Sequence, residues 1–215
     1  MNIYKHNTAS VFVDPQNTFT PLCPEELPVP EGDKIVDELN ALLDFTSVHL
    51  ASGDEHPVDA LYFADDEHPQ FSPAPKGEDM DIRWNRHGVV GTYGADLIKG
   101  LPRKGDYDLY IAKGTRADQH PYGMCYYDLS EKEPSGAIEF LKQRKIVTVL
   151  IGGLATDYCV KNSALQLARA GFKVIVNLAA CRGIDPDTVE QAVIEMEACG
   201  VCFVQNASQL RSVEN

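Results

Sequence analysis

The sequence predicts an α/β fold of three layers, in which a mostly parallel sheet of six strands lies between helices on both faces. Six short runs rich in Val and Ile recur along the chain, and segments with helical spacing of apolar residues separate most of them. Buried parallel strands joined by right-handed helical crossovers produce this alternation. Residues that end or open helices also stand between the two kinds of segment, as at Gly171 and Asp185-Pro186.

The predicted strands are the apolar runs themselves, in chain order Ser10–Val13, Val48–Ala51, Leu109–Ala112, Thr148–Ile151, Lys173–Val176 and Val201–Val204. The predicted helices carry apolar stripes, which are Ile35, Leu39, Leu42 and Leu43; Ala137, Phe140 and Leu141; Val160 to Ala168; and the segment from Asp185 to Gly200. No repeat and no linker interrupts the series, so residues 1–215 are predicted to form a single domain.

The segment from Asp54 to Trp84 breaks the alternation. It has no strand or helix pattern, and it contains four prolines, Pro57, Pro69, Pro73 and Pro75. Long loops of this kind in compact domains are usually functional or disordered. Two histidines, His56 and His68, lie in this segment, and His87 follows it closely.

Composition and charge exclude several classes of function. The chain has 215 residues, 44% of them hydrophobic, and its 19 Lys and Arg against 32 Asp and Glu give a formal net charge of −13. An acidic protein repels nucleic acid and anionic lipid, and no apolar stretch approaches the roughly 20 residues of a membrane helix. The start MNIYKHNTAS lacks the apolar core of a secretory signal. We therefore expect a cytoplasmic protein with reduced cysteines and no nucleic-acid or membrane partner.

Polar residues follow four of the predicted strands, where the ligand crevice of an open α/β sheet lies. Asp14, Asp54 and Lys113 follow the first three runs, and Cys159 follows the fourth after a short glycine-containing segment. If the four strands are parallel neighbours, a carboxylate, an ammonium group, a thiol and a second carboxylate that could bind a metal meet at one edge of the sheet.

Cys159 is the candidate nucleophile. Thr156 or Asp157 is predicted to cap the helix that follows, so that the thiol lies in its first turn, where the helix dipole and a nearby ammonium group favour the reactive thiolate. The preceding Gly152-Gly153 would let the backbone approach a ligand closely. The alternative is a buried structural cysteine.

Asp14 and Lys113 complete a catalytic relay with this thiol. Lys113 would lie between the carboxylate and the sulfur, while Asp14 takes the thiol proton and later delivers it to a leaving group. Each residue alone has a simpler interpretation, since Asp14 could satisfy a turn and Lys113 could be a solvated charge. The set of three is more informative than any member.

Asp54, His56 and His87 offer one oxygen and two imidazole ligands. This set suits zinc, iron or manganese when water fills the open positions. The spacing alone is a weak signal, because His56-Pro57 could form a turn and His87 could lie on the surface.

Several segments resemble motifs of the isochorismatase-like cysteine hydrolases, and within them of the nicotinamidase, or pyrazinamidase, family. Gly153–Val160 is similar to the nucleophile motif and is the most specific match. The other matches run in the family's order between about Val11 and Val204: Val13–Phe19, Asp54–Pro57, Trp84–His87 with Gly91–Ala95, and Lys113–Thr115.

The resemblance implies an isochorismatase-like, Rossmann-like fold and a metal-dependent amidase that converts nicotinamide to nicotinate and ammonia through a cysteine thioester, in NAD salvage. The residue roles that it implies are the triad Asp14, Lys113 and Cys159; the metal ligands Asp54, His56 and His87; the oxyanion-hole N–H groups of Ala155 and Cys159; and Phe19 and Trp84 at the pyridine ring. It also implies a cis peptide before Ala155 and a ring nitrogen bound to one divalent ion, with zinc preferred over iron or manganese. The sequence leaves the oligomeric state open, and a homo-oligomer is one of the alternatives.

The chain departs from the family pattern at Glu55, where Trp is common, and at Ala60, where a further His is common. Asn85-Arg86 and Gly88 around His87, and Thr18, are also unusual. A fourth protein ligand is therefore in question; water is the first expectation for that position and His68 the second. The alternatives to the nicotinamide reaction are another small-amide or N-carbamoyl amide hydrolase of the same superfamily and a catalytically degenerate member that binds a ligand.

Overall fold

The centre of the computed structural model is a sheet of six strands in the order β4-β3-β2-β5-β6-β7, with every neighbouring pair parallel. The structure describes residues 1–76 and 79–213. The strands are β2 (Thr8–Val13), β3 (Val48–Asp54), β4 (Leu109–Lys113), β5 (Thr148–Leu154), β6 (Lys173–Arg182) and β7 (Cys202–Val204). All six predicted strands are confirmed, and the four that precede the candidate site residues are neighbours.

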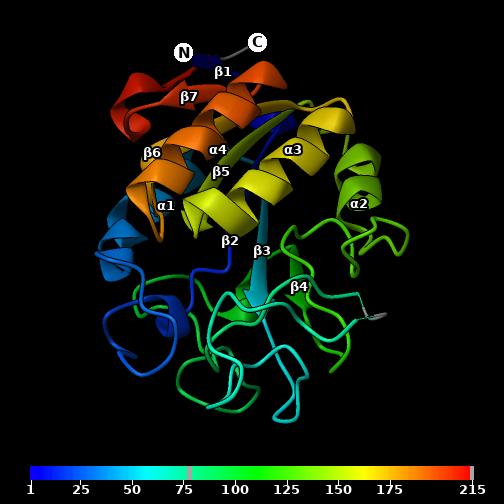
Figure 1. The fold of residues 1–215 in the computed structure, drawn as a ribbon. Coiled ribbons are helices and arrows are strands. Elements are labelled where there is room, and N and C mark those ends of the chain that lie inside the picture. The colour runs from blue at the N-terminus through cyan, green and yellow to red at the C-terminus, as the bar shows by residue number, and fades with distance from the viewer. Residues whose placement is uncertain (77–78, 214–215) are drawn as a thin grey trace.

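Helices cover both faces of this sheet, as predicted (Figure 1). They are α1 (Val36–Leu42), α2 (Ala137–Gln143), α3 (Lys161–Arg169) and α4 (Pro186–Ala198). Alternate residues of β5 point to opposite faces, so Val149 and Ile151 pack in the cluster that contains α2, α3 and α4. Leu150 packs in the other cluster, beside Leu39 of α1.

A second, two-stranded sheet pairs β1 (Asn2–Ile3) with β8 (Arg211–Ser212) near the two ends of the chain (Figure 1). The sequence did not predict this sheet, because two residues are too few to show an alternating pattern. The sheet is parallel, with Asn2 opposite Arg211.

Long loops gather at the carboxyl edge of the large sheet, in the lower half of Figure 1. The loop after β3 has little regular structure, but isolated bridges such as Phe63 to Trp84 fix its course, and the Trp84 N–H donates to the Tyr62 carbonyl at 2.9 Å. Tyr62 also anchors a small apolar cluster with Ala60, Ala74 and Met80. In the described part of the chain, none of the helices has the length and apolar character that a bilayer-spanning segment requires.

Candidate active site

The ends of four neighbouring strands bring the predicted catalytic residues together. Asp54 and Lys113 are register partners at the ends of β3 and β4, and Asp14 directly follows β2. The Lys113 ammonium lies 3.0 Å from Asp14 Oδ2, 2.5 Å from Asp54 Oδ1 and 3.6 Å from Cys159 Sγ. All four side chains are buried. The predicted meeting of these groups at one edge of the sheet is confirmed.

Ser52 of the neighbouring strand β3 fixes the Asp14 carboxylate. The Ser52 hydroxyl donates to Asp14 Oδ1 at 2.6 Å and accepts the Asp14 N–H at 3.3 Å. Burial raises the pKa of Asp14 to about 6, although the Lys113 charge and the bond from Ser52 act in the opposite direction. A carboxyl group with this pKa can accept and return a proton near neutral pH.

Lys113 and Asp54 are held in their charged forms by each other. Burial alone would lower the pKa of Lys113, but the carboxylates of Asp14 and Asp54 raise it well above its usual range. Burial likewise opposes ionisation of Asp54, but Lys113 and His56 hold the pKa of this carboxyl well below its usual range. One ammonium group therefore lies between two carboxyl groups in a site without solvent exposure.

The Cys159 thiol lies in a turn, Thr156–Val160, that precedes α3. The predicted cap is wrong: Ala155 occupies the N-cap position, and no side chain bonds there. Asp157 instead accepts the Ile184 N–H at 3.1 Å and the Thr188 hydroxyl at 2.6 Å, which ties the turn to the start of α4. The Asp157 carboxylate is thus bonded to residues distant in the sequence, which a local sequence pattern could not reveal.

Burial opposes the thiolate form that the sequence pattern favours at Cys159. Burial raises the pKa of the Cys159 thiol well above its usual range, and the opposing effect of Lys113 does not outweigh it. Asp14 and Asp54 add to this rise. This direction favours the protonated thiol over the thiolate.

The two glycines before the turn have a different role from the one predicted. A Cβ at Gly153 would lie 2.0 Å from the Val13 carbonyl oxygen, and one at Gly152 would lie 2.7 Å from the Ala180 and Leu39 side chains. The glycines therefore let β5 pack closely against its neighbours.

The predicted metal ligands form a cluster that shares Asp54 with the Lys113 ammonium group. His87 Nδ1 donates to the Asn85 carbonyl at 2.7 Å, and His56 Nδ1 donates to the Gly114 carbonyl at 2.9 Å. With the proton on Nδ1, each ring presents the lone pair of Nε2, and these two atoms lie 3.2 Å apart. Asp54 Oδ2 lies 3.6 Å from His56 Nε2 and 3.8 Å from His87 Nε2. Two facing lone pairs beside a carboxylate fit a divalent cation bound between them.

The sequence missed one member of this cluster, His120. One atom each of Asp54, His56, His87 and His120 lie within 4.8 Å of one another. Burial, with His56 nearby, holds the pKa of His120 well below its usual range, so the ring is neutral. The expectation that His68 could be the fourth ligand is wrong, because its half-exposed ring pairs with Asp65 at 3.0 Å. The only available signal was that His120 follows the strand that carries Lys113.

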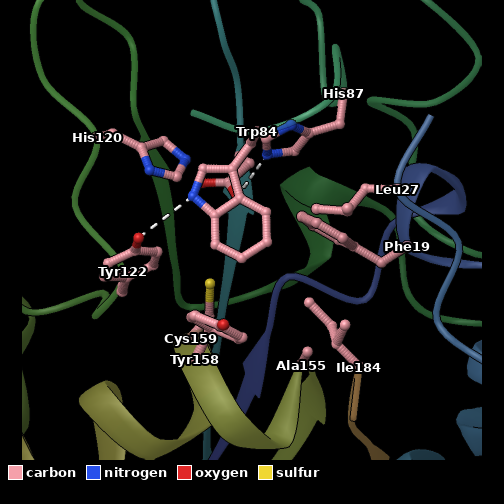
Figure 2. Close-up of a pocket in the computed structure, with 11 residues that line it drawn as sticks. Phe19, Leu27, Trp84, His87, His120, Tyr122, Ala155, Tyr158, Cys159 and Ile184 are labelled. Atoms are coloured by element: carbon pink, nitrogen blue, oxygen red, sulfur yellow. Dashed lines mark hydrogen bonds and ion pairs between the residues drawn. The ribbon is translucent and has the colours of Figure 1, made fainter. Parts of the chain in front are cut away.

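An apolar pocket lies between the thiol and the histidine cluster. Its lining includes the predicted ring-binding residues Phe19 and Trp84, together with Leu27, Tyr122, Tyr158 and Ile184. Figure 2 shows the Cys159 side chain pointing into the cavity from the turn before α3, while His87 and His120 enter it from the loops opposite. The cavity therefore has a reactive group at one end and metal-binding groups at the other.

Trp84 is held in place by a hydrogen-bond chain. Its Nε1 donates to the Tyr122 hydroxyl at 3.2 Å, and this hydroxyl donates to Asp81 at 2.7 Å (Figure 2 shows the first bond). Ala155 lines the same cavity, and the peptide bond between Leu154 and Ala155 is cis, as the resemblance implied.

The model of the isochorismatase domain matches residues 8–208 of the chain. The chain belongs to the isochorismatase family. The nicotinamidase of Escherichia coli (strain K12) is 31% identical to this family member over 199 residues, which cover 89% of this chain and 92% of the relative. With this identity and coverage, the chain falls within the nicotinamidase branch.

Two solved structures with the same level of identity also match this isochorismatase-family chain. The Acinetobacter baumanii nicotinamidase and pyrazinamidase gives a TM-score of 0.86 at 31% identity and covers 95% of this chain and 98% of its own. The pyrazinamidase of Pyrococcus horikoshii in complex with zinc gives a TM-score of 0.73 at 31% identity and covers 93% and 99%. The predicted fold and the family resemblance are both confirmed.

Proposed function

We propose that this chain, acting as one hydrolase domain over residues 1–215, is a metal-dependent amidase that hydrolyses nicotinamide to nicotinate and ammonia. The observation that carries the proposal is the buried thiol of Cys159. It lines an aromatic-walled cavity and lies 3.6 Å from the Lys113 ammonium group, which itself lies 3.0 Å from Asp14. Relatives about 31% identical over most of the chain are nicotinamidases. Nicotinate is a precursor for NAD, so the reaction serves NAD salvage.

The lining of the cavity supports an aromatic amide as the substrate. Phe19 and Trp84 supply aromatic surface for a pyridine ring, and most of the other lining side chains are apolar or aromatic. The carboxamide would lie at the Cys159 end, and the ring nitrogen would face the histidines.

The first chemical step transfers the thiol proton to Asp14 as the Cys159 sulfur attacks the carboxamide carbon. The backbone N–H groups of Ala155 and Cys159 stabilise the oxyanion that forms. Asp14 then returns the proton to the departing nitrogen, ammonia leaves, and the acyl group remains on sulfur as a thioester. Throughout the step, the fixed charge of Lys113 balances the neighbouring carboxylates.

The second step releases nicotinate. A water molecule attacks the thioester carbon while Asp14 takes one of its protons. The C–S bond then breaks as this proton passes from Asp14 to the Cys159 sulfur, and nicotinic acid leaves and ionises to nicotinate in solution. Because the pKa of Asp14 is about 6, the same group can act as base and as acid at neutral pH. Lys113 keeps its proton and acts only through its charge.

Asp54, His56 and His87 would hold one divalent ion in this proposal. When bound, the ion supplies a Lewis acid for the ring nitrogen and so orients the substrate. Zinc is the first expectation for an oxygen and two imidazoles, and iron or manganese suits the same set. A zinc complex of a 31% identical pyrazinamidase agrees with this expectation.

The test is ammonia release from nicotinamide by the parent chain and by Cys159→Ala. The parent should release ammonia and the variant should not, while both keep the same far-ultraviolet circular dichroism. Benzamide, which has the carboxamide but no ring nitrogen, should be a poor substrate. A parent that hydrolyses N-carbamoyl amides but not nicotinamide, or that releases no ammonia from any small amide, would overturn the proposal.

A further inference from the structure

His120 is a buried polar side chain whose ring has no hydrogen-bond partner among the described residues. The residue is 3% exposed, and neither Nδ1 nor Nε2 forms a hydrogen bond within that part of the chain. A buried imidazole without partners is costly, because folding removes its hydrogen bonds to water without replacing them. The described residues therefore leave both ring nitrogens of His120 available to a bound ligand.

The nearest polar side chains are already engaged. The Tyr62 ring lies 4.5 Å from the His120 ring, but its hydroxyl donates to the Gly114 carbonyl at 3.1 Å and lies 2.7 Å from His56 Nδ1. The Tyr122 ring lies 5.2 Å away, but its hydroxyl donates to Asp81. The backbone is fixed as well, because the His120 N–H donates to the Asp79 carbonyl at 3.0 Å.

The position of the ring identifies the missing partner. Its centroid lies 5.3 Å from that of His56 and 5.8 Å from that of His87. One nitrogen of His120 lies within 4.8 Å of the ligand atoms of Asp54, His56 and His87. Around one ion with metal–ligand distances of about 2.1 Å, ligand atoms are separated by about 3.4 Å in a tetrahedron and by up to about 4.2 Å in an octahedron. One ion can therefore reach all four side chains after small adjustments.

We propose that His120 is a fourth protein ligand of the divalent ion, so that three imidazoles and one carboxylate bind it. The proposal rests on the metal site of the proposed function and adds a ligand from a different loop. His120 follows β4, whereas Asp54, His56 and His87 come from the end of β3 and the loop after it.

The added ligand restricts how a substrate can bind. Four protein ligands fill a tetrahedral shell, so the ring nitrogen can bind the ion only as a fifth or sixth ligand. Zinc can expand to five ligands, and iron(II) and manganese(II) accept six. His120 is therefore expected to shift the metal preference of this chain toward ions that accept higher coordination numbers.

The decisive measurement counts the imidazoles around the ion. The full-length chain is stripped with a chelator and reloaded with one equivalent of zinc, and X-ray absorption at the metal edge then determines the ligands. We expect three imidazoles in the parent and two in His120→Ala. Because the count in the parent needs no variant, it remains decisive even if His120→Ala folds poorly.

Affinity supplies the second readout. Competition with a chromophoric chelator should show at least about 100-fold weaker zinc binding in His120→Ala, more than the loss of an outer-shell contact causes. His68→Ala is the matched control, because His68 is half-exposed and bonded to Asp65, and its affinity should equal that of the parent. His56→Ala should weaken binding at least as much as His120→Ala.

The outcomes separate the two proposals. Two imidazoles in the parent, or a His120→Ala affinity within about threefold of the parent, would show that His120 is not a ligand and would leave the proposed function intact. A parent with three imidazoles that hydrolyses no nicotinamide would support the ligand and overturn the function. A parent that binds no divalent metal would overturn both the ligand and the metal's role.

Discussion

The two ends of the cavity are built in different ways. At one end, the reactive groups lie at or just after the ends of strands in one continuous parallel sheet. These groups are Asp14, Lys113 and Cys159. At the other end, Trp84 and His120 come from long loops after β3 and β4, which isolated bridges and single hydrogen bonds hold in place. In the proposed reaction the strand end holds the groups that make and break bonds, and the loop end holds the groups that bind the ring.

This difference determines whether a functional side chain can come from another position in the sequence. A residue at a strand end has its position set by the register of the sheet, so a triad of strand-end groups has little freedom to move along the sequence. Loop residues can reach the same point from different places in the chain. His120 lies beside the predicted metal ligands, although His68 had been expected as the alternative.

The largest effect is expected at the strand end. Asp14→Asn removes the base and should lower ammonia release by about 10⁴-fold, nearly as much as Cys159→Ala, because the two residues act as a unit. The double variant should be scarcely worse than either single variant. Asp37→Asn on the exposed side of α1 is the control and should keep full activity. If the rate loss of the double variant equals the product of the two single losses, the two residues act separately.

At the loop end, His87→Ala should reduce metal binding and nicotinamide affinity together, each by about 100-fold, because this residue supports the ion that holds the ring. Stripping the metal from the parent should have the same effect on nicotinamide affinity. Alkylation of the Cys159 thiol by iodoacetamide should change little, since the strand end remains intact. If the parent hydrolyses benzamide as fast as nicotinamide, the loop end does not bind the substrate through its ring nitrogen, and the proposed division between the two ends is wrong.

A smaller effect is expected one contact away from the ion. Tyr62→Phe removes the hydroxyl beside His56 Nδ1, which helps to fix the tautomer that presents Nε2. Metal affinity should fall by about 10-fold, at the low end of outer-shell effects. Tyr4→Phe, at an exposed tyrosine, serves as the control. If Tyr62→Phe binds the metal as tightly as the parent does, the Gly114 carbonyl alone orients the His56 ring.

The smallest effect is a shift in pH dependence. Asp14 must be ionised to accept the thiol proton, so kcat/KM should fall as the pH drops through about 6. The hydrogen bond from Ser52 favours the ionised form of Asp14. Ser52→Ala should therefore raise the pKa of Asp14 and move the acidic limb to higher pH. A limb that stays in place or moves to lower pH would show that another group controls it.

Most of the sheet could be predicted, because buried parallel strands produce long apolar runs that are visible in the sequence. The ends of these runs also placed Asp14, Asp54 and Lys113 correctly. The pair β1 and β8 could not be predicted, because each strand has two residues and owes its pairing to the way the chain ends meet.

The parts of the site that were missed depend on contacts between distant segments. Asp157 has a capping residue's sequence position, but its carboxylate bonds to residues at the start of α4. The state of the Cys159 thiol depends on its complete burial, which no local pattern records. His120 could not be selected because its loop carries no periodic signal, and only the fold brings it to Asp54, His56 and His87.

The central claim is that the thiol at the strand end forms the covalent intermediate. The direct measurement mixes the chain with nicotinamide, quenches the reaction in acid and locates any acylated residue by peptide mass spectrometry. The account predicts a nicotinoyl group on Cys159 alone, and none on the Cys159→Ala variant. A nicotinoyl group on another residue, or product formation by Cys159→Ala at the parent rate, would contradict it.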